Sequence, residues 1–357
     1  MFATEGEIPK GYYDAIDRLP NEISDKLPEG IYSDNIDEVK NSAEELMSAE
    51  YLFSFFSELL STDIGEAIAL LGKICGLLVL SSVFSAIKTS ITSSALAAAF
   101  EFCTTCSLFA AFVSMLITQI NAVSLFFERL NSLMLGFIPI TCAVWAMGGN
   151  VGTAASAGGT LYVFLGFCEF LCAKAIIPVS SLCVAFALCR GVSPSINFSG
   201  FSSALKKCYT FLLGLIMTVL LAVLSTQTIL TTASDSVAAR GAKMITATVI
   251  PVVGGAVSET LRTLGASVQY IKSVVGVSAI AMIILLLLPT LISLLVTRFV
   301  YILSGSVADL LGCERESKLI GDIGGVYGLM IAAVSMASVM FILGLNIFIR
   351  STVAVGG

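Results

Sequence analysis

Five long apolar segments constrain this chain more than any other feature of its sequence. Each is long enough, as a helix, to cross about 30 Å of hydrocarbon. Lipid cannot satisfy exposed backbone N–H and C=O groups, so spanning segments of this length are expected to be helical. The sequence therefore predicts an all-α, polytopic membrane helix bundle. The five segments lie near residues 67–87, 97–120, 208–230, 273–297 and 325–349.

The apolar stretch between Leu133 and Cys189 is interrupted. Pro139, the run GGNVGTAASAGG at 148–159, and Pro178 divide it into short pieces. Proline removes a backbone donor and clashes with the preceding turn, and glycine adds backbone freedom. This stretch is compatible with one, two or three crossings.

The segment ATVIPVVGGAVSETL, residues 247–261, is also unsuited to a straight transmembrane helix, because it holds Pro251 and two glycines. We expect residues 133–147 and 245–258 to be paired short elements, broken or re-entrant, with prolines at similar depth. Broken backbone at membrane depth persists only where protein or a water-lined cavity satisfies its polar groups.

The proline spacing predicts an internal repeat. Pro139 and Pro251 follow the Thr-Gln dipeptides that end two long apolar segments, by 20 and 24 residues. Pro178 and Pro289 come a further 39 and 38 residues later. Transporters built from repeats place broken helices and binding sites at the repeat interface. The expected repeat units are residues 97–190 and 208–298.

Charge divides the chain into two parts. Residues 1–66 hold 16 Asp and Glu against 4 Lys and Arg, whereas residues 67–357 hold 9 against 15. Cytoplasmic flanks of spans favour Lys and Arg. We therefore expect an acidic extracytoplasmic region at 1–66, a multi-pass membrane domain at 67–357, and cytoplasmic basic loops. These loops carry Arg190, Lys206 and Lys207 in one case and Arg298, Arg315 and Lys318 in the other.

The acidic region is expected to contain an amphipathic helix from Asn41 to Leu60. Asn41 or Ser42 can cap its start, and its leucines and phenylalanines recur at spacings compatible with one face. This face should lie on the membrane or on the protein's own spans.

Several classes of function are disfavoured. The chain has no histidine, which removes the usual general base and the imidazole metal motifs. The ten cysteines lie mostly in apolar runs, where a free thiol packs as a small hydrophobe. We expect no cofactor, no metal and no enzymatic activity. The acidic first part and the lipid-embedded second part also argue against nucleic-acid binding.

Ionisable residues inside apolar stretches usually face a bundle interior or a watery cavity. Glu169 is the best candidate for a buried functional carboxylate, with Lys174 as a partner, although Lys174 is equally suited to snorkelling from a span end. Glu259 is expected near the mouth of a cavity. The residues expected to line a channel or repeat interface are Pro139, Glu169, Pro178, Pro251, Gly254, Gly255, Glu259 and Pro289.

Four glycine pairs have GxxxG spacing, which lets helices approach closely. Helix packing is the plain interpretation, and self-association into a homo-oligomer through one of these faces is the alternative. The pairs are Gly72 with Gly76, Gly148 with Gly152, Gly321 with Gly325, and Gly324 with Gly328.

The segment VIPVVGGAVSETL, preceded by VAARGAKMITAT at 237–248 and accompanied by FIP near Pro139 and an acidic N-terminal region, resembles the stage III sporulation protein AE family. The resemblance covers essentially the whole chain. It implies a mother-cell membrane component of the complex that links mother cell and forespore, required for late forespore sigma factor G activity. It also implies partners among the other stage III sporulation operon proteins and a forespore membrane protein, and it carries no catalytic residue.

Three interpretations remain open from the sequence. The first is a component of a sporulation channel or secretion complex. The second is a stand-alone secondary transporter of a small solute, and the third is a scaffold that conducts nothing. The repeat with broken segments favours the first two, and the acidic outer region, as a partner surface, favours the first and third.

Overall fold

The computed structural model describes residues 8–9, 11–88, 94–192, 199–249 and 254–350, and all regular structure within these ranges is helical. Six helical passes within them are long and apolar enough to cross a membrane. The helices are α1 Gly11–Ile16, α2 Asn21–Ser24, η1 Glu29–Tyr32, α3 Ile36–Leu46, α4 Ala49–Lys88, α5 Ser94–Met147, α6 Val151–Cys168, the π-helical turn η2 Glu169–Lys174, α7 Ile176–Val192, α8 Ser199–Val249, α9 Gly254–Leu310 and α10 Glu314–Arg350.

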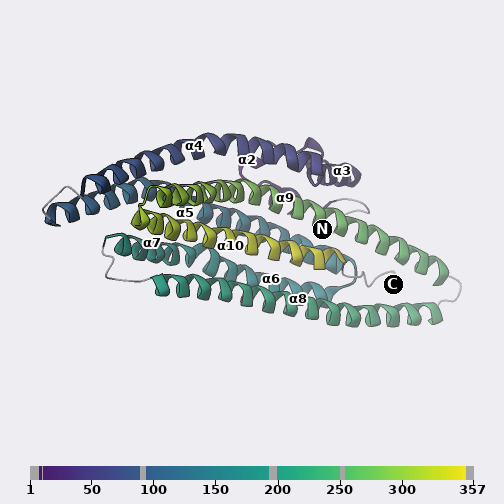
Figure 1. Ribbon diagram of the computed structural model, residues 1–357. Coiled ribbons are helices and arrows are strands. Elements are labelled where there is room, and N and C mark those ends of the chain that lie inside the picture. The colour runs from purple at the N-terminus through teal and green to yellow at the C-terminus, as the bar shows by residue number, and fades with distance from the viewer. Residues whose placement is uncertain (1–7, 10, 89–93, 193–198, 250–253, 351–357) are drawn as a thin grey trace.

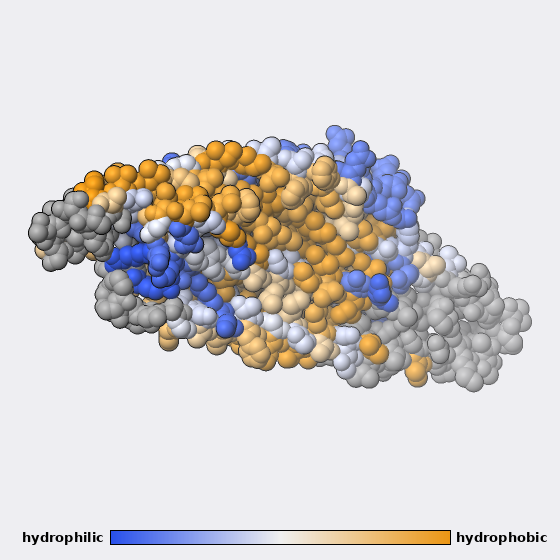
Figure 2. Space-filling model, in the orientation of Figure 1, coloured by the Kyte–Doolittle hydropathy of each residue, from blue (hydrophilic) through white to orange (hydrophobic). Residues whose placement is uncertain are grey.

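The six long passes run side by side in alternating directions (Figure 1). They are α4, α5, α6 with α7, α8, α9 and α10. All five apolar segments expected from the sequence lie within the helices. On the visible face, hydrophilic residues gather in two main areas with a broad hydrophobic band between them (Figure 2). The predicted all-α polytopic membrane bundle is therefore confirmed.

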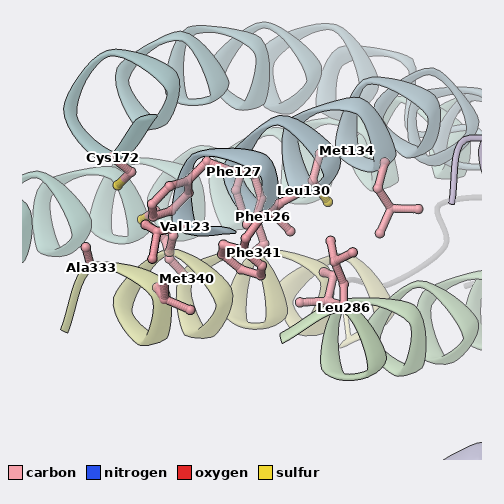
Figure 3. Close-up of a cluster of buried hydrophobic side chains, with 14 of the residues drawn as sticks. Val123, Phe126, Phe127, Leu130, Met134, Cys172, Leu286, Ala333, Met340 and Phe341 are labelled. Carbon is pink, nitrogen blue, oxygen red and sulfur yellow. The ribbon is translucent and has the colours of Figure 1, made fainter. Parts of the chain in front are cut away.

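Helix α10 lies at the centre of the bundle. It packs on α9, α7, α8 and α5, and its most apolar stretch has the largest buried share of any candidate span. Between α5 and α10 the interior is filled by side chains, including Val123, Phe126, Phe127, Met340 and Phe341 (Figure 3). Close packing of apolar side chains against α10 therefore joins α5, α7, α8 and α9, and α4 is held through α9 and α5.

The expectation of a short separate element at 133–147 is wrong. These residues form the last part of the 54-residue helix α5, which continues through Pro139. Phe137, Ile138 and Ile140, on either side of the proline, are almost fully buried. Their packing outweighs the lost backbone hydrogen bond, a loss that membrane helices commonly tolerate at proline.

The second expected short element, 245–258, lies at a junction between two long helices. Helix α8 ends at Val249 and α9 begins at Gly254, so the segment joins two helices and does not interrupt one (Figure 1). Pro251 lies outside the described residues.

The interrupted stretch 133–189 contains one turn and one further pass. Gly149 has a φ of +77°, a backbone conformation that favours glycine, and the Asn150 N–H donates to the Trp145 carbonyl at 2.9 Å. This turn ends α5. Residues 151–190 then form one candidate span, so of the three alternatives the structure gives a single additional crossing.

The single helix expected from Asn41 to Leu60 is also wrong. Helix α3 ends at Leu46 and α4 begins at Ala49, because Ser48 Oγ accepts the Tyr51 N–H at 3.2 Å and starts a new helix. The cap of α3 is Asn35, whose Oδ1 accepts the Asp37 N–H at 3.0 Å. Helix α4 then runs uninterrupted past residue 66, so the expected boundary between the two parts of the chain falls inside a helix.

The N-terminal helices pack on the bundle itself. Helix α1 lies on α5, and α3 lies on α9. The Tyr270 hydroxyl of α9 donates to Asp37 Oδ1 at 2.5 Å. Within the region, the Tyr13 hydroxyl donates to the Ser33 carbonyl at 2.9 Å. Partial burial and the nearby Asp34 carboxylate raise the pKa of Tyr13 to about 12, so this hydroxyl remains a donor at neutral pH.

The two expected repeat units correspond to α5 with α6 and α7, and to α8 with α9. Pro178 lies twelve residues before Arg190, which pairs with Asp322 of α10. Pro289 lies nine residues before Arg298, which lies against Gly328 of α10. Both α7 and α9 run opposite to α10 (Figure 1). Both prolines are therefore level with about residues 334–337 of α10, although the repeat itself stays a prediction.

Candidate functional site: a cationic cluster on the glycine face of α10

The described residues expected to line a channel do not form one site. Pro139 is exposed on α5, Pro178 is exposed at the third residue of α7, and Pro289 is half-buried in α9. Helices α7 and α9 both pack on α10 but, among the described residues, have no extensive contact with each other. The other expected residues are Glu169, which begins η2, and Gly254, Gly255 and Glu259, which lie at the start of α9; the side chains of both glutamates are outside the described part of the chain.

The break expected near Pro178 takes the form of the π-helical turn η2, which ends at the exposed Lys174. The Ala175 N–H reaches back five residues to the Phe170 carbonyl at 2.9 Å, and Pro178 has no N–H to offer the carbonyl of Lys174. A π turn leaves backbone carbonyls short of donors, and such turns are frequent at functional sites. Here the buried Tyr209 of α8 compensates, because its hydroxyl donates to the Leu171 carbonyl at 2.7 Å.

One helical turn before Tyr209, cationic side chains converge on α10. Arg190 Nη2 of α7 lies 2.8 Å from Asp322 Oδ2, and both side chains are mostly buried. The same nitrogen donates to the Lys318 carbonyl at 3.0 Å. Lys206 Nζ of α8 donates to the Asp322 carbonyl at 3.2 Å. The two basic segments expected on one side of the membrane therefore meet at one end of the bundle.

Two glycines of α10 lie where the charged ends of Lys206 and Arg298 approach the helix. A Cβ atom at Gly325 would lie 2.6 Å from Lys206 Nζ. A Cβ atom at Gly328 would lie 3.4 Å from Cζ of Arg298 and 3.5 Å from each of its two terminal nitrogens. Gly325 and Gly328 therefore accommodate charged head groups.

The other GxxxG glycines behave differently from one another. Gly324 packs helices as expected, because a Cβ atom there would meet the Cβ of Tyr301 on α9 at 3.5 Å. A Cβ atom at Gly72, Gly76 or Gly321 would meet nothing within 4 Å among the described residues. These three glycines therefore do not bring described helices of this chain together.

The cluster has more positive than negative charge. Within the described part of the chain, the carboxylate that interacts with Arg190 and Lys206 is that of Asp322, and Arg298 makes no hydrogen bond or ion pair. Like charges that are partly shielded from water repel one another more strongly than in bulk solvent. Ionisable groups inside membrane bundles are costly and usually functional. This cluster is therefore the strongest candidate site.

Buried hydroxyl groups extend the site along α9 and α10. The rings of Tyr301 and Tyr327 are 5.0 Å apart, and Tyr301 also meets Phe112 of α5 at 5.5 Å. Among the described residues, the buried hydroxyl of Ser304 has no hydrogen-bond partner, and the buried hydroxyls of Tyr301 and Tyr327 interact with each other without the geometry of a regular hydrogen bond. An unpaired buried hydroxyl costs about 1–3 kcal/mol, so this region is suited to a polar occupant.

The importance of Lys206 and Arg298 was missed from the sequence, where they served only as markers of the cytoplasmic side. A signal was present for Arg298, because it interrupts the otherwise apolar run LISLLVTRFVYIL. The contact of both cations with glycines of α10 depends on how three helices pack, which no spacing within one segment reveals. Among the described residues no group of three potential metal ligands occurs.

The long apolar passes, the packed interior and the buried charges define a polytopic α-helical membrane protein. Comparison with known proteins narrows this class. The chain belongs to the stage III sporulation protein AE family, whose family model matches residues 32–352. It is also similar to stage III sporulation protein AE of Bacillus subtilis (strain 168), with 23% identity over 342 residues that cover 93% of this chain and 83% of that protein. No solved structure matches the chain. The resemblance inferred from the sequence is confirmed.

Proposed function

We propose that this protein is a mother-cell membrane component of the channel or secretion complex that links mother cell and forespore, and that late forespore sigma factor G activity depends on it. The family match over residues 32–352 carries this proposal. The expected partners are other stage III sporulation operon proteins and a forespore membrane protein.

The packing of the bundle supports a role as one component of a larger assembly. The described interior between α5 and α10 is filled with apolar side chains (Figure 3). A groove of about 440 Å³ between α4 and α9 is apolar throughout, with Phe56, Ile68, Phe299 and Leu303 among its lining residues. Neither feature offers a polar solute a path. These two features of the described residues therefore favour a role beside other chains or further copies of this one.

The alternative of a stand-alone secondary transporter is favoured by one observation. Half-buried cations lie against α10, which with α9 also carries buried hydroxyls, and transporters place their binding sites among broken and polar segments. Solute uptake by vesicles that contain only this protein would support the transporter. Absence of uptake would leave the channel component and the scaffold.

The proposal is tested by deleting the gene in the host and following a sigma factor G reporter in the forespore. We expect reporter activity to be lost, to return with the parent chain, and to coincide with protein in the membrane around the forespore. Full reporter activity in the deletion strain would refute the proposal.

We also propose that the N-terminal helices lie outside the cytoplasm. Tyr270, which meets α3, and Arg298, in the cationic cluster, are 28 residues apart on α9, or about 42 Å at 1.5 Å per residue. This exceeds the roughly 30 Å of the hydrocarbon core. The acidic and basic ends can therefore lie on opposite sides of the membrane, with the basic end in the cytoplasm.

A membrane-impermeant thiol reagent tests this orientation. Asp25→Cys places a thiol at an exposed position directly after α2. In intact cells whose outer membrane surface the reagent can reach, this variant should be labelled more strongly than the parent chain. Lys318→Cys, exposed at the basic end, is the matched control and should react only after the cells are opened. The reverse pattern would show that the proposed orientation is wrong.

A further inference from the structure

We propose that Lys206 and Arg298 form a binding site for an anionic group, a phosphate, over Gly325 and Gly328 of α10. The site needs no assumption about the channel, because it depends only on contacts within this chain. Three observations carry it: the position of the Arg298 guanidinium, its unused donors within the described part of the chain, and the adjacent ammonium group of Lys206.

The Arg298 guanidinium lies flat on α10. Its Cζ and both terminal nitrogens are at nearly equal distances, 3.4 to 3.5 Å, from the point where Gly328 would carry a Cβ atom. One face of the group is therefore against the helix backbone, and its N–H edges point along the helix surface. A guanidinium has five N–H donors in a fixed fork, and none is used within the described part of the chain.

Lys206 provides a second cation on the same face. Its Nζ lies 2.6 Å from the Cβ position of Gly325, and Cβ positions three residues apart on a helix are roughly 5–6 Å apart. The Lys206 ammonium and the Arg298 guanidinium are therefore at most about 12 Å apart. One donor of Nζ is used, by the Asp322 carbonyl.

Arg298 has no carboxylate partner within the described part of the chain, and Lys206 shares the Asp322 carboxylate with Arg190. The Asp322 carboxylate is engaged by Arg190 at 2.8 Å. Tyr301 lies one turn from Arg298 on α9, and Tyr327 adjoins Gly328 on α10; their hydroxyls are buried and interact with each other. The Arg298 guanidinium and the Lys206 ammonium supply the donors that a phosphate requires, since a phosphate accepts hydrogen bonds through several oxygens.

The phosphate can belong to a lipid headgroup or to a free anion. Arg298 is only half-buried, and the exposed Phe211 lies five residues beyond Lys206 on α8, so the site is within reach of the surrounding lipid. Guanidinium groups are well suited to bidentate contact with either form. The experiment distinguishes the two sources.

The full chain is purified in a maltoside detergent, which carries no phosphate, and its thermal midpoint is measured with inorganic phosphate against chloride at equal ionic strength. A second set of samples contains phosphatidylglycerol, with a neutral glycolipid as its control. A rise in the midpoint with phosphate identifies a free anion, and a rise with phosphatidylglycerol alone identifies a lipid headgroup. No rise with either probe overturns the proposal.

A variant and a matched control test the assignment to these residues. Arg298→Gln should weaken the apparent affinity about tenfold or more, because it removes the charged fork. Lys207→Gln, at the exposed neighbour of Lys206, should leave it unchanged. An equal loss in both variants would mean diffuse attraction and would overturn the site.

Two glycine variants, Gly325→Ala and its control Gly321→Ala, test the site independently in case Arg298→Gln does not fold. Gly325→Ala places a methyl group where Lys206 Nζ lies, and the flexible side chain can move without disturbing α10, so the protein should fold and bind the probe several-fold more weakly. Gly321→Ala, about one turn earlier and facing open space, is the control. Unchanged binding by a folded Gly325→Ala protein would contradict the proposed position of Lys206.

Discussion

Replacement of Asp322 by asparagine should lower the stability of the bundle more than any other charge removal at its basic end. The carboxylate interacts with both Arg190 and Lys206, and it is mostly buried beside Arg190 at 2.8 Å. Removing one partner of a buried ion pair leaves an uncompensated charge and costs about 3–5 kcal/mol. We expect about 3 kcal/mol here, because both side chains keep some contact with solvent.

The loss is measured as the thermal midpoint of the purified protein, where it should correspond to a decrease of roughly 5–10 °C. Asp322→Asn combined with Arg190→Gln should recover part of it, since the double variant no longer buries an unpaired arginine. Glu314→Gln is the control: its pair with Lys318 spans 3.7 Å between exposed side chains and should contribute at most about 0.5 kcal/mol. Equal midpoints for Asp322→Asn and Glu314→Gln would refute the structural role of Asp322.

The fold was predictable to the extent that it depends on local composition. Apolar length predicted the spans, because the bilayer sets that length. Prediction from the apolar pattern failed where packing against neighbouring segments determines whether a helix continues or ends. Pro139 is helical because Phe137, Ile138 and Ile140 are buried around it, and the break at Ser48 depends on a single hydroxyl cap that a periodic apolar pattern does not reveal.

The candidate site was less predictable, for a different reason. Summed charge placed Arg190 and Arg298 on the same side of the membrane, and the ion pair with Asp322 and the contact with Gly328 agree with that placement. Which cation remains unpaired depends on the register of α7, α8 and α9 against α10. Register arises from contacts between segments more than a hundred residues apart, such as Lys206 with Asp322, and the spacing of residues within one segment does not reveal such contacts.

The N-terminal helices offer the second large effect, at Gly136 in the FIP-containing part of α5. A Cβ atom there would lie 2.7 Å from Cβ and 2.9 Å from Cα of Ala15, so α1 sits directly on the glycine. The clash involves the backbone of Ala15, which cannot move away from the new side chain as a flexible side chain could. Gly136→Leu should therefore push α1 off the bundle.

Undocking of α1 would expose Tyr12 and Ile16, both fully buried, and would separate Tyr12 from Phe137. Overpacking of this kind costs about 1–3 kcal/mol, which corresponds to roughly a 5- to 150-fold larger open population. Trypsin cleavage after Arg18 or Lys26 should accelerate by a similar factor, because proteolysis follows the opened state.

Gly166→Leu separates this effect from a general cost of leucine in a membrane helix, because a side chain at the exposed Gly166 of α6 meets open space. Its cleavage rate should equal that of the parent. If Gly136→Leu is also cleaved at the parental rate, α1 is not held by the glycine. If α1 is released while the bundle stays in the membrane, the sigma factor G reporter then tests the proposed partner surface. Lost activity would support the docked N-terminal helices as that surface, because the substitution in α5 leaves the residues of the cationic cluster unaltered.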